Sequence, residues 1–501
     1  MNNPWTADTG DGHYRNPVLF ADWSDPDVVR AGDDFYLTAS SFNRVPGLPL
    51  LHSTDLVNWA LIGHALRRLP DEYAVVRPGC GVWAPALRLH DGRFWIVYPD
   101  PDHGIYVTTA DDPAGPWSEP RLVLPGRGLI DPCPLWDADG SAYLVHGWAK
   151  SRAGFNNRLT AYAMKPDLEA PIGPATVIVD GGDIDGCRTL EGPKWYRHDD
   201  WYWIFAPAGG VAGGWQYAMR SRHVFGPYEP RIVLAQGSTG VNGPHQGAWV
   251  DTGAGEDWFL HFQDLGAFGR VVHLQPMRWD DQGWPVIGDR GAPVPGFRKP
   301  ATGPAWTSTP PVADRFPGGR PGPQWSWPAN PEPGRVLQHP GDGLRLACVA
   351  HPGGDLRQAP HVLGQRLPGP RLRAATGVRL DAGPGARAGL VVRGRTYAWI
   401  GLEKRTDGTF LTCRFAEEGE AEQDVADPVE VPAGAGVRLV VTVTGTAVIR
   451  FAADIGGERW ESGPPFTATG GGWIGAALGL FAIGTDGHAD FDPLSITAED
   501  Q

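Results

Sequence analysis

Three carboxylic acids stand directly before a proline or a Gly-Pro pair and open a strand-like run. They are Asp25 in SDPDVV, Asp131 in IDPCPLW and Glu191 in LEGPKWY. Taken alone, an acidic residue before proline is more often part of a turn than of a site. Two such groups across one pocket could split a glycosidic bond, because one carboxyl gives a proton to the leaving oxygen while another activates water or attacks. A third can raise the pKa of the acid and orient it.

A repeated unit predicts how these carboxylates are positioned. Units begin at Asp25, Ala84, Asp131, Glu191 and Gly243, so each is roughly 50 to 60 residues long, as in propeller blades. Each start is followed by a strand, a polar turn and a second, aromatic strand; the second strands are DFYLTASS, RFWIVYPD, SAYLVHGW, WYWIFAPA and DWFLHFQD. Helical periodicity is nearly absent. The pattern predicts an all-β, five-bladed β-propeller, with a β-sandwich as the alternative.

In a propeller the innermost strand of each blade lines a central channel. The residue at its mouth projects into a funnel on one face. Three of the five blade starts place a carboxylate there, and the others place Ala84 and the Gly243-Pro244-His245 turn. Carboxylates far apart in sequence would thus converge in space. Because such groups repel one another and resist ionisation, their convergence favours catalysis over a structural role.

The region after the repeats has a different composition. Nine prolines fall between Pro293 and Pro323, which predicts a strap or linker. Runs such as YAWIGLEK, VRLVVTVTGTAVIRFAA and WIGAALGLFA then predict a β-sandwich from about residue 313 to 501. We therefore divide the chain into residues 1–300, the propeller, and 301–501, the strap and sandwich. The charged run EEGEAEQDVADP is expected to be a solvated loop.

Composition excludes several classes of function. The 501 residues carry a net charge of −14, which argues against nucleic acid as a partner. Five widely spaced cysteines form no disulfide framework and no Cys-x-x-Cys pair. The first residues show no signal peptide and no apolar run reaches ~18 residues, so we expect a cytoplasmic protein without membrane contact. G-x-S-x-G, Walker and H-E-x-x-H motifs are absent.

Several stretches together resemble glycoside hydrolase family 43. They are NPVLFADWSDPDVVRAGDDFYLTASSF, GVWAPALRLHDGRFWIVY, LIDPCPLWDADGSAYLVHG, RTLEGPKWYRHDDWYWIFAPAGG and HLQPMRW. The family contains β-xylosidases and α-L-arabinofuranosidases. The part from GPQWSW through YAWIGLEK resembles the concanavalin-like, jelly-roll sandwich appended to its β-xylosidase-type members.

The resemblance implies roles for the three carboxylates. By position, it implies Asp25 as general base, Asp131 as pKa modulator and orienter, and Glu191 as general acid. The first motif departs slightly from the commoner Pro-Asp-Pro-Ser form, since here it reads Ser24-Asp25-Pro26-Asp27. Asp27 is adjacent, but the motif favours Asp25.

The resemblance also implies binding residues. Arg270 in AFGRVVHLQPM matches the arginine that contacts the sugar. His245 in NGPHQGAW matches a channel histidine that lies beside calcium or water in many members; a buried, satisfied histidine is the equal alternative. Trp83 and Phe42 are candidate pocket walls, with ordinary propeller core as the alternative for each.

These observations predict an inverting, exo-acting glycosidase that releases terminal xylose or arabinofuranose from plant-type oligosaccharides. The expected partners are xylo- and arabino-oligosaccharides, with a homo-oligomer as an option. No cofactor is expected for the chemistry, although the channel could hold a structural calcium ion. One rival is a fructan- or sucrose-cleaving propeller, which expects an Arg-Asp-Pro stabiliser and a Glu-Cys acid, whereas this chain has Ile130 and Gly192 there. Another is a non-catalytic sugar-binding propeller.

Overall fold

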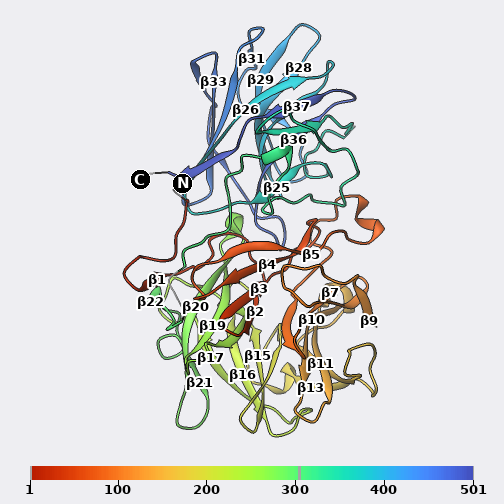
Figure 1. The fold of residues 1–501 in the computed structure, drawn as a ribbon, viewed down its shortest axis with the longest axis vertical. Helices are drawn as coiled ribbons and strands as arrows, with labels where there is room; N and C mark the ends of the chain where they lie inside the picture. Colours follow the sequence, from red (N-terminus) through yellow and green to blue (C-terminus); the bar gives the residue numbers. More distant parts are fainter. Residues whose placement is uncertain (1–2, 303–305, 352, 500–501) are drawn as a thin grey trace.

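The computed structural model describes residues 3–302, 306–351 and 353–499. It has two all-β domains, one stacked on the other along the longest axis of the molecule (Figure 1). Within the described ranges, helix is confined to α1 (Lys150–Ala153) and four 3-10 turns at Asp71–Ala74, Gly181–Asp183, Gly266–Phe268 and Pro317–Gly319. Among the described residues, no helix is long and apolar enough to cross a membrane.

The first domain is the predicted five-bladed propeller. Each blade is a four-stranded antiparallel sheet whose strands pair in chain order. Blade I holds β2 (Asp27–Ala31), β3 (Asp34–Thr38), β4 (Gly47–Ser53) and β5 (Ala60–Leu66), and blade II holds β6 (Ala86–His90), β7 (Arg93–Asp100), β8 (Gly104–Ala110) and β9 (Arg121–Pro125). Blade III holds β10 (Leu129–Trp136), β11 (Ala142–Trp148), β12 (Arg158–Met164) and β13 (Thr176–Asp180), and blade IV holds β14 (Lys194–His198), β15 (Trp201–Ala208), β16 (Trp215–Ser221) and β17 (Glu229–Ala235). Blade V holds β18 (His245–Asp251), β19 (Asp257–Asp264), β20 (Arg270–Trp279) and β21 (Pro285–Ile287).

The repeat unit found in the sequence is the blade. RFWIVYPD, WYWIFAPA and DWFLHFQD are β7, β15 and β19 from first residue to last. These strands lie between two neighbours in each sheet and pack against other blades, so most of their residues are buried on both faces. Continuous apolar runs are typical of such strands. Trp203 of β15 and Trp258 of β19 are fully buried, as is Trp195 of the neighbouring strand β14.

The ring is closed by the N-terminal segment. Its strand β1 (His13–Arg15) pairs with β22 (Gly296–Arg298), which follows blade V. Farther along, the backbone of Leu19 bridges Val272 of β20. This segment therefore ties the start of blade I to the last blade, and it leads directly into the Asp25 turn.

The second domain is the predicted sandwich of two antiparallel sheets. One contains β23 (Val336–Leu337), β24 (Leu344–Ala347), β37 (His488–Phe491), β26 (Leu372–Asp381), β32 (Val437–Val443), β33 (Val448–Ile455), β34 (Glu458–Glu461), β35 (Phe466–Thr467) and β38 (Ser495–Ala498). The other contains β25 (Leu363–Arg366), β36 (Ala477–Ile483), β27 (Arg387–Arg393), β28 (Tyr397–Lys404), β29 (Thr409–Ala416), β30 (Gln423–Asp424) and β31 (Val429–Glu430). Side chains such as Leu390 and Ile400 of one sheet and Leu439 and Val441 of the other share one apolar core.

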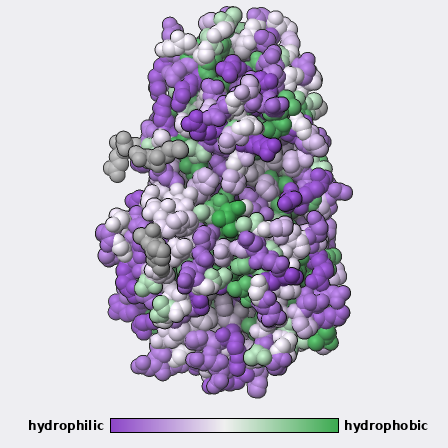
Figure 2. Space-filling model, in the orientation of Figure 1, coloured by the Kyte–Doolittle hydropathy of each residue, from purple (hydrophilic) through white to green (hydrophobic). Residues whose placement is uncertain are grey.

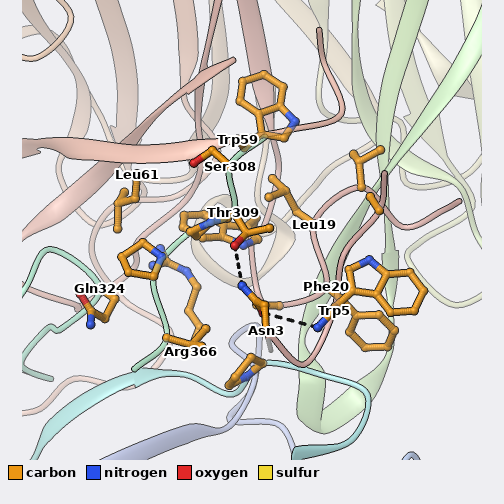
Figure 3. A pocket seen from close by; sticks show the side chains of 18 of the residues that line it. Asn3, Trp5, Leu19, Phe20, Trp59, Leu61, Ser308, Thr309, Gln324 and Arg366 are labelled. Atoms are coloured by element: carbon orange, nitrogen blue, oxygen red, sulfur yellow. Dashed lines mark hydrogen bonds between the residues drawn. The ribbon is translucent and has the colours of Figure 1, made fainter. Parts of the chain in front are cut away.

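The two domains meet through backbone pairing and through a cavity. Val45 of the propeller and Trp327 of the sandwich exchange two backbone hydrogen bonds of 2.8 and 2.7 Å. The N-terminal segment and the proline-rich strap run beside each other there, and the Asn3 side chain donates to Thr309 at 2.5 Å (Figure 3). On the face shown in Figure 2, a small hydrophobic patch lies near the middle of the molecule, while both ends are mostly hydrophilic.

Candidate active site

One cavity at the mouth of the propeller channel collects side chains from all five blades and from the sandwich. It holds about 440 Å³ of empty space, counting its open mouth. Its lining comprises Asp25, Phe42, Trp83, Ala84, Ile130, Asp131, Glu191, Val211, Gln246, Arg270 and Trp473. The three carboxylates predicted to converge do converge here.

Asp25 is placed by a strained turn just before β2. Its φ of 53° lies in the left-handed region, which costs a residue other than glycine about 1 kcal/mol or more and occurs preferentially at functional sites. The side chain is nearly buried, and both of its oxygens accept hydrogen bonds. Ser40 donates to Oδ2 at 2.5 Å, and Arg270 donates to Oδ1 at 2.6 Å. Asp25 is therefore fixed in orientation as an acceptor.

Asp131 lies against Glu191 of the next blade. Its φ is 56°, a second left-handed aspartate at a blade start. Burial, together with the negative charges of Glu191 and Asp25, raises the pKa of Asp131 to about 8, although the backbone N–H of Gly192 donates to its Oδ2 at 2.8 Å and opposes the rise. The cluster therefore retains a proton near neutral pH.

Glu191 is the most accessible of the three carboxylates, with 24% of its side chain exposed. Its Oε1 lies 2.9 Å from Nε2 of His245, the first residue of β18 in blade V. Gly192 follows it with a φ of 59°, and a Cβ there would come within 3.0 Å of Pro207 and Gln246. The Glu-Gly-Pro motif thus needs its glycine so that the chain can turn past blade V.

His245 is buried, and its surroundings test whether this chain could coordinate the structural calcium ion considered for the channel. Its Nδ1 has no hydrogen-bond partner in the described part of the chain. The described residues contain no group of three or more His, Cys, Asp or Glu side chains arranged to hold a metal. Calcium prefers oxygen ligands. Direct coordination by this chain therefore does not fit, and His245 could approach such an ion only through water.

Arg270, for which the resemblance implies contact with the sugar, lines the same cavity. It begins β20, is almost fully buried, and lies 4.6 Å from the Phe262 ring centroid and 5.7 Å from that of Trp473. Its backbone N–H donates to Oδ1 of Asp22 at 3.2 Å, which anchors it from behind. Its Nε has no partner among the described residues, so it can still donate to a ligand.

Phe42 and Trp83 both line the cavity, as the sequence predicted. Their rings lie 6.3 Å apart in an edge-to-face arrangement. Trp83 is half-buried and is held by a hydrogen bond of 2.9 Å from its indole N–H to the carbonyl of Gly79. A fixed, partly exposed aromatic surface of this kind is suited to contact the apolar face of a sugar ring.

Trp473 is a wall residue that sequence reasoning missed. The run WIGAALGLFA predicted a strand from Trp473, but β36 begins at Ala477, and that prediction was wrong at its start. Trp473 instead lies on a glycine-rich loop of the sandwich, 48% exposed, with its ring 6.2 Å from that of Trp83. An exposed tryptophan between glycines, in GGGWIG, was the available signal.

Gln246 is a second lining residue that was missed. It follows His245 with a φ of 32°, and its Nε2 is buried without a partner in the described chain. A buried amide left unpaired is costly unless a ligand or water satisfies it. Gln246 therefore supplies a polar group that a sugar hydroxyl could bind.

Asp27 has a structural environment, in line with the preference for Asp25. It is fully buried and accepts hydrogen bonds from the backbone of Leu87 at 2.9 Å and from Arg88 at 2.8 Å. Lys194 of blade IV lies 3.3 Å away. Asp27 does not line the cavity and instead joins three blades below it.

The charged run EEGEAEQDVADP was expected to be a solvated loop, which is wrong at Glu422 and at the short strand β30 (Gln423–Asp424). Glu422 is largely buried, forms an ion pair with Arg387, and accepts a hydrogen bond of 2.8 Å from the Tyr397 hydroxyl. The sequence pattern shows only the charge of the run. The cross-sheet partners that bury Glu422 are far from it along the chain.

Comparison with known proteins agrees with this architecture. The model of glycosyl hydrolases family 43 matches residues 14–285, and that of the beta xylosidase C-terminal concanavalin A-like domain matches residues 313–497. A relative from Xylanibacter ruminicola is 36% identical over 485 residues, covering 94% of this chain and 87% of its own. A beta-xylosidase of Formosa agariphila is 30% identical, covering 95% and 88%. The solved structure titled Bacteroides ovatus Xyloglucan PUL GH43B has a TM-score of 0.85 at 28% identity and covers 97% of this chain and 100% of that one.

Proposed function

The chain belongs to glycosyl hydrolases family 43, and on that premise we propose that it is an inverting, exo-acting glycosidase that removes terminal pentoses from xylan-derived oligosaccharides. The observation that carries this proposal is the convergence of Asp25, Asp131 and Glu191 in one cavity whose wall is completed by Trp473 of the second domain. A cavity closed on one side by another domain favours the end of a chain over its middle.

The contacts support a distinct role for each carboxylate. Glu191, the most accessible, is placed to give a proton to the leaving oxygen. Asp25, held by Ser40 and Arg270 as an acceptor, is placed to take a proton from water. Burial of Asp131, together with its repulsion by Glu191 and Asp25, raises the pKa of Asp131, which keeps a proton in the cluster at neutral pH.

The positions of the blades favour inversion. Asp25 starts blade I and Glu191 starts blade IV, so the two are not neighbours in a ring of five. Two carboxyl groups ~6.5–9.5 Å apart leave room for a water molecule that attacks the sugar, which gives inversion. A separation of ~5 Å suits direct attack by a carboxylate, which gives retention. Asp131, from blade III, is next to Glu191 and is the natural modulator.

Relatives' names support two substrates. One relative is named a beta-xylosidase and another, from Bacteroides ovatus, a non-reducing end alpha-L-arabinofuranosidase. The two sugars have similar shapes, so the same cavity could hold either at its end. A panel of nitrophenyl glycosides tests this: we expect release from β-xyloside or α-L-arabinofuranoside and none from hexosides. Activity confined to hexosides, or no activity, would contradict the proposal.

We also propose that the chemistry needs no cofactor and that calcium, where bound, has a structural role beside His245. Because calcium prefers oxygen ligands, the buried, unpartnered Nδ1 of that residue supports only a contact through water with such an ion. Dialysis against a chelator should leave the rate constant at saturating substrate unchanged. A loss of activity restored by calcium, with the melting temperature unchanged, would contradict this.

A further inference from the structure

A second, larger cavity lies between the two domains and is called the junction cleft here. It holds about 1680 Å³ of empty space, counting its open side. The propeller contributes Asn43, Arg44, Val76 and Pro78, and the sandwich contributes the rest, including four glycines of the loops around Gly394 and Gly472. Four arginines line it: Arg44, Arg357, Arg393 and Arg395.

Two of these arginines are neutralised by the protein. Arg44 lies 3.1 Å from Oδ2 of the buried Asp22, and Arg357 lies 2.9 Å from Oδ1 of Asp355. Arg357 also donates to backbone carbonyls of the loop at Glu417 and Glu420, so its guanidinium is occupied.

The other two arginines form no ion pair with a carboxylate in the described part of the chain. Arg393 ends β27 and donates to the carbonyl of Leu356 at 3.0 Å. It forms no ion pair of its own among the described residues, although the charge of Asp355, which is paired with Arg357, acts on it. Arg395, two residues on, is exposed and also lacks an ion pair among the described residues. Glu418 and Glu420 line the cleft as well, but both are exposed and neither pairs with these arginines in the described chain.

A third unpaired arginine lies behind the cleft. Arg366 occupies the aromatic cavity of Figure 3, where its Nε donates to the carbonyl of Asp22 at 2.7 Å and its guanidinium lies 4.0 Å from the Trp23 ring centroid. The described residues place no carboxylate within ion-pair distance of it. Asp22 thus faces Arg44 and Arg366 with a single negative charge.

This arrangement leaves positive charge at the domain junction. Burial, with a further contribution from the charge of Arg44, lowers the pKa of Arg366 to about 9 and that of Arg393 to about 10. A guanidinium withdrawn from water without a counter-charge is costly, and a bound anion removes that cost. Guanidinium groups pair best with carboxylate and phosphate oxygens, often through two parallel hydrogen bonds.

We propose that the junction cleft binds a small oxyanion through Arg393 and Arg395. The site is distinct from the active-site cavity. Binding of a free oxyanion there does not depend on the proposed glycosidase activity, whereas binding of an acidic sugar that is part of a substrate rests on it. A third cavity, which shares Arg395 and Gly472 with the cleft, extends to Arg270 and Trp473 at the active site. The oxyanion could therefore be a free inorganic ion or the carboxylate of an acidic sugar on the departing part of a substrate.

Thermal denaturation of the full chain tests the proposal without any turnover. Sodium phosphate and sodium glucuronate are each titrated at constant ionic strength against sodium chloride, with glucose as the uncharged control for the sugar. We expect the melting temperature to rise saturably, by a few degrees, with at least one of the two oxyanions. A rise with phosphate alone indicates a free ion, and a tighter response to glucuronate indicates an acidic sugar.

The variant Arg393→Met separates a binding site from a structural arginine. It keeps the apolar length of the side chain and removes the charge, so in chloride it should melt at the same temperature as the wild type or higher. It should also lose the response to oxyanions. Arg290→Met, at a side chain 86% exposed on blade V, is the matched control and should keep that response.

Two results would overturn the proposal. One is the absence of a saturable rise with both oxyanions in the wild type. The other is an unchanged response in Arg393→Met. If that variant does not fold, Arg395→Met is used instead, because Arg395 is exposed; it should weaken apparent oxyanion affinity about tenfold, and an unchanged affinity would also refute the site.

Discussion

The propeller and the sandwich contribute to the same cavity in different ways. The propeller contributes most of its lining residues from equivalent positions, at or beside the starts of its inner strands, and three of these are carboxylates. Phe42, Val211 and Arg270 come from other parts of the blades. The sandwich contributes a single tryptophan from a loop between Gly472 and Ile474, outside its regular strands. Reactive groups thus come from the repeated part of the scaffold, and the wall that shapes the cavity comes from an irregular part.

The loop that carries Trp473 is held by the propeller. Its Ala476 N–H donates to the carbonyl of Ala267 at 2.7 Å, just before Arg270. Gly475 packs so closely on Gly269 that a Cβ would come within 2.8 Å of its backbone. The loop that forms the cavity wall is therefore attached to the propeller turn that leads into β20. Four perturbations can distinguish the contribution of the carboxylates from that of the wall.

The largest effect is expected for Glu191→Ala in the propeller. Loss of a general acid costs roughly 10²–10⁴-fold in rate, and poor leaving groups need the proton most. We expect a loss near the upper end of this range on xylo- or arabino-oligosaccharides and a much smaller loss on activated aryl glycosides. Steady-state kinetics on both substrate types provide the check. Equal losses on both would contradict the acid role.

Removal of the sandwich should have the second-largest effect. A fragment of residues 1–310 would expose the propeller surface that pairs with Trp327 and the Asp22 carbonyl that accepts from Arg366, and it would lack Trp473. We expect it to be poorly soluble or inactive. Expression, light scattering and activity on an aryl pentoside provide the test. A stable, fully active fragment would show that the sandwich is dispensable.

A point change at the wall should have a moderate effect. Trp473→Ala keeps every carboxylate but removes one side of the cavity, and truncating a tryptophan contact typically costs about 2 kcal/mol, on the order of 30-fold. We expect this loss mainly in KM. Trp201→Ala, at the far end of blade IV from Glu191, is the control and should retain wild-type kinetics. A fall in kcat alone would assign Trp473 to the chemical step.

The smallest effect is on stability and concerns Asp131. Its pKa is raised to about 8 in the folded protein, above the usual value for an unfolded chain. The folded state therefore binds more protons between these two values, so stability falls as pH rises through that window. Asp131→Asn removes this penalty. Its melting temperature, relative to wild type, should be higher by a few degrees more at pH 9 than at pH 5; an equal difference at both pH values would contradict the shift.

The contrast between the repeated blades and the irregular sandwich loop also explains which site residues could be predicted from the sequence. Asp25, Asp131 and Glu191 recur at equivalent positions of a repeat, and the blade strands carry their own period, so local patterns were enough. Trp473 depends on how a loop of one domain docks on a turn of another, and no local pattern encodes that contact. Gln246 lines the cavity because of its left-handed backbone, which the sequence around His245 does not reveal. Likewise, Glu422 is buried by partners on β27 and β28.

The central claim is that Asp25 activates water while Glu191 protonates the leaving group. Proton NMR of the first sugar released from a β-xyloside, or from an α-L-arabinofuranoside if that is the better substrate, tests it most directly. Inversion predicts that a β-xyloside gives α-xylose first, with β-xylose appearing only through mutarotation. Initial β-xylose, or a trapped glycosyl ester on Asp25, would show that Asp25 attacks the sugar itself and would contradict this account.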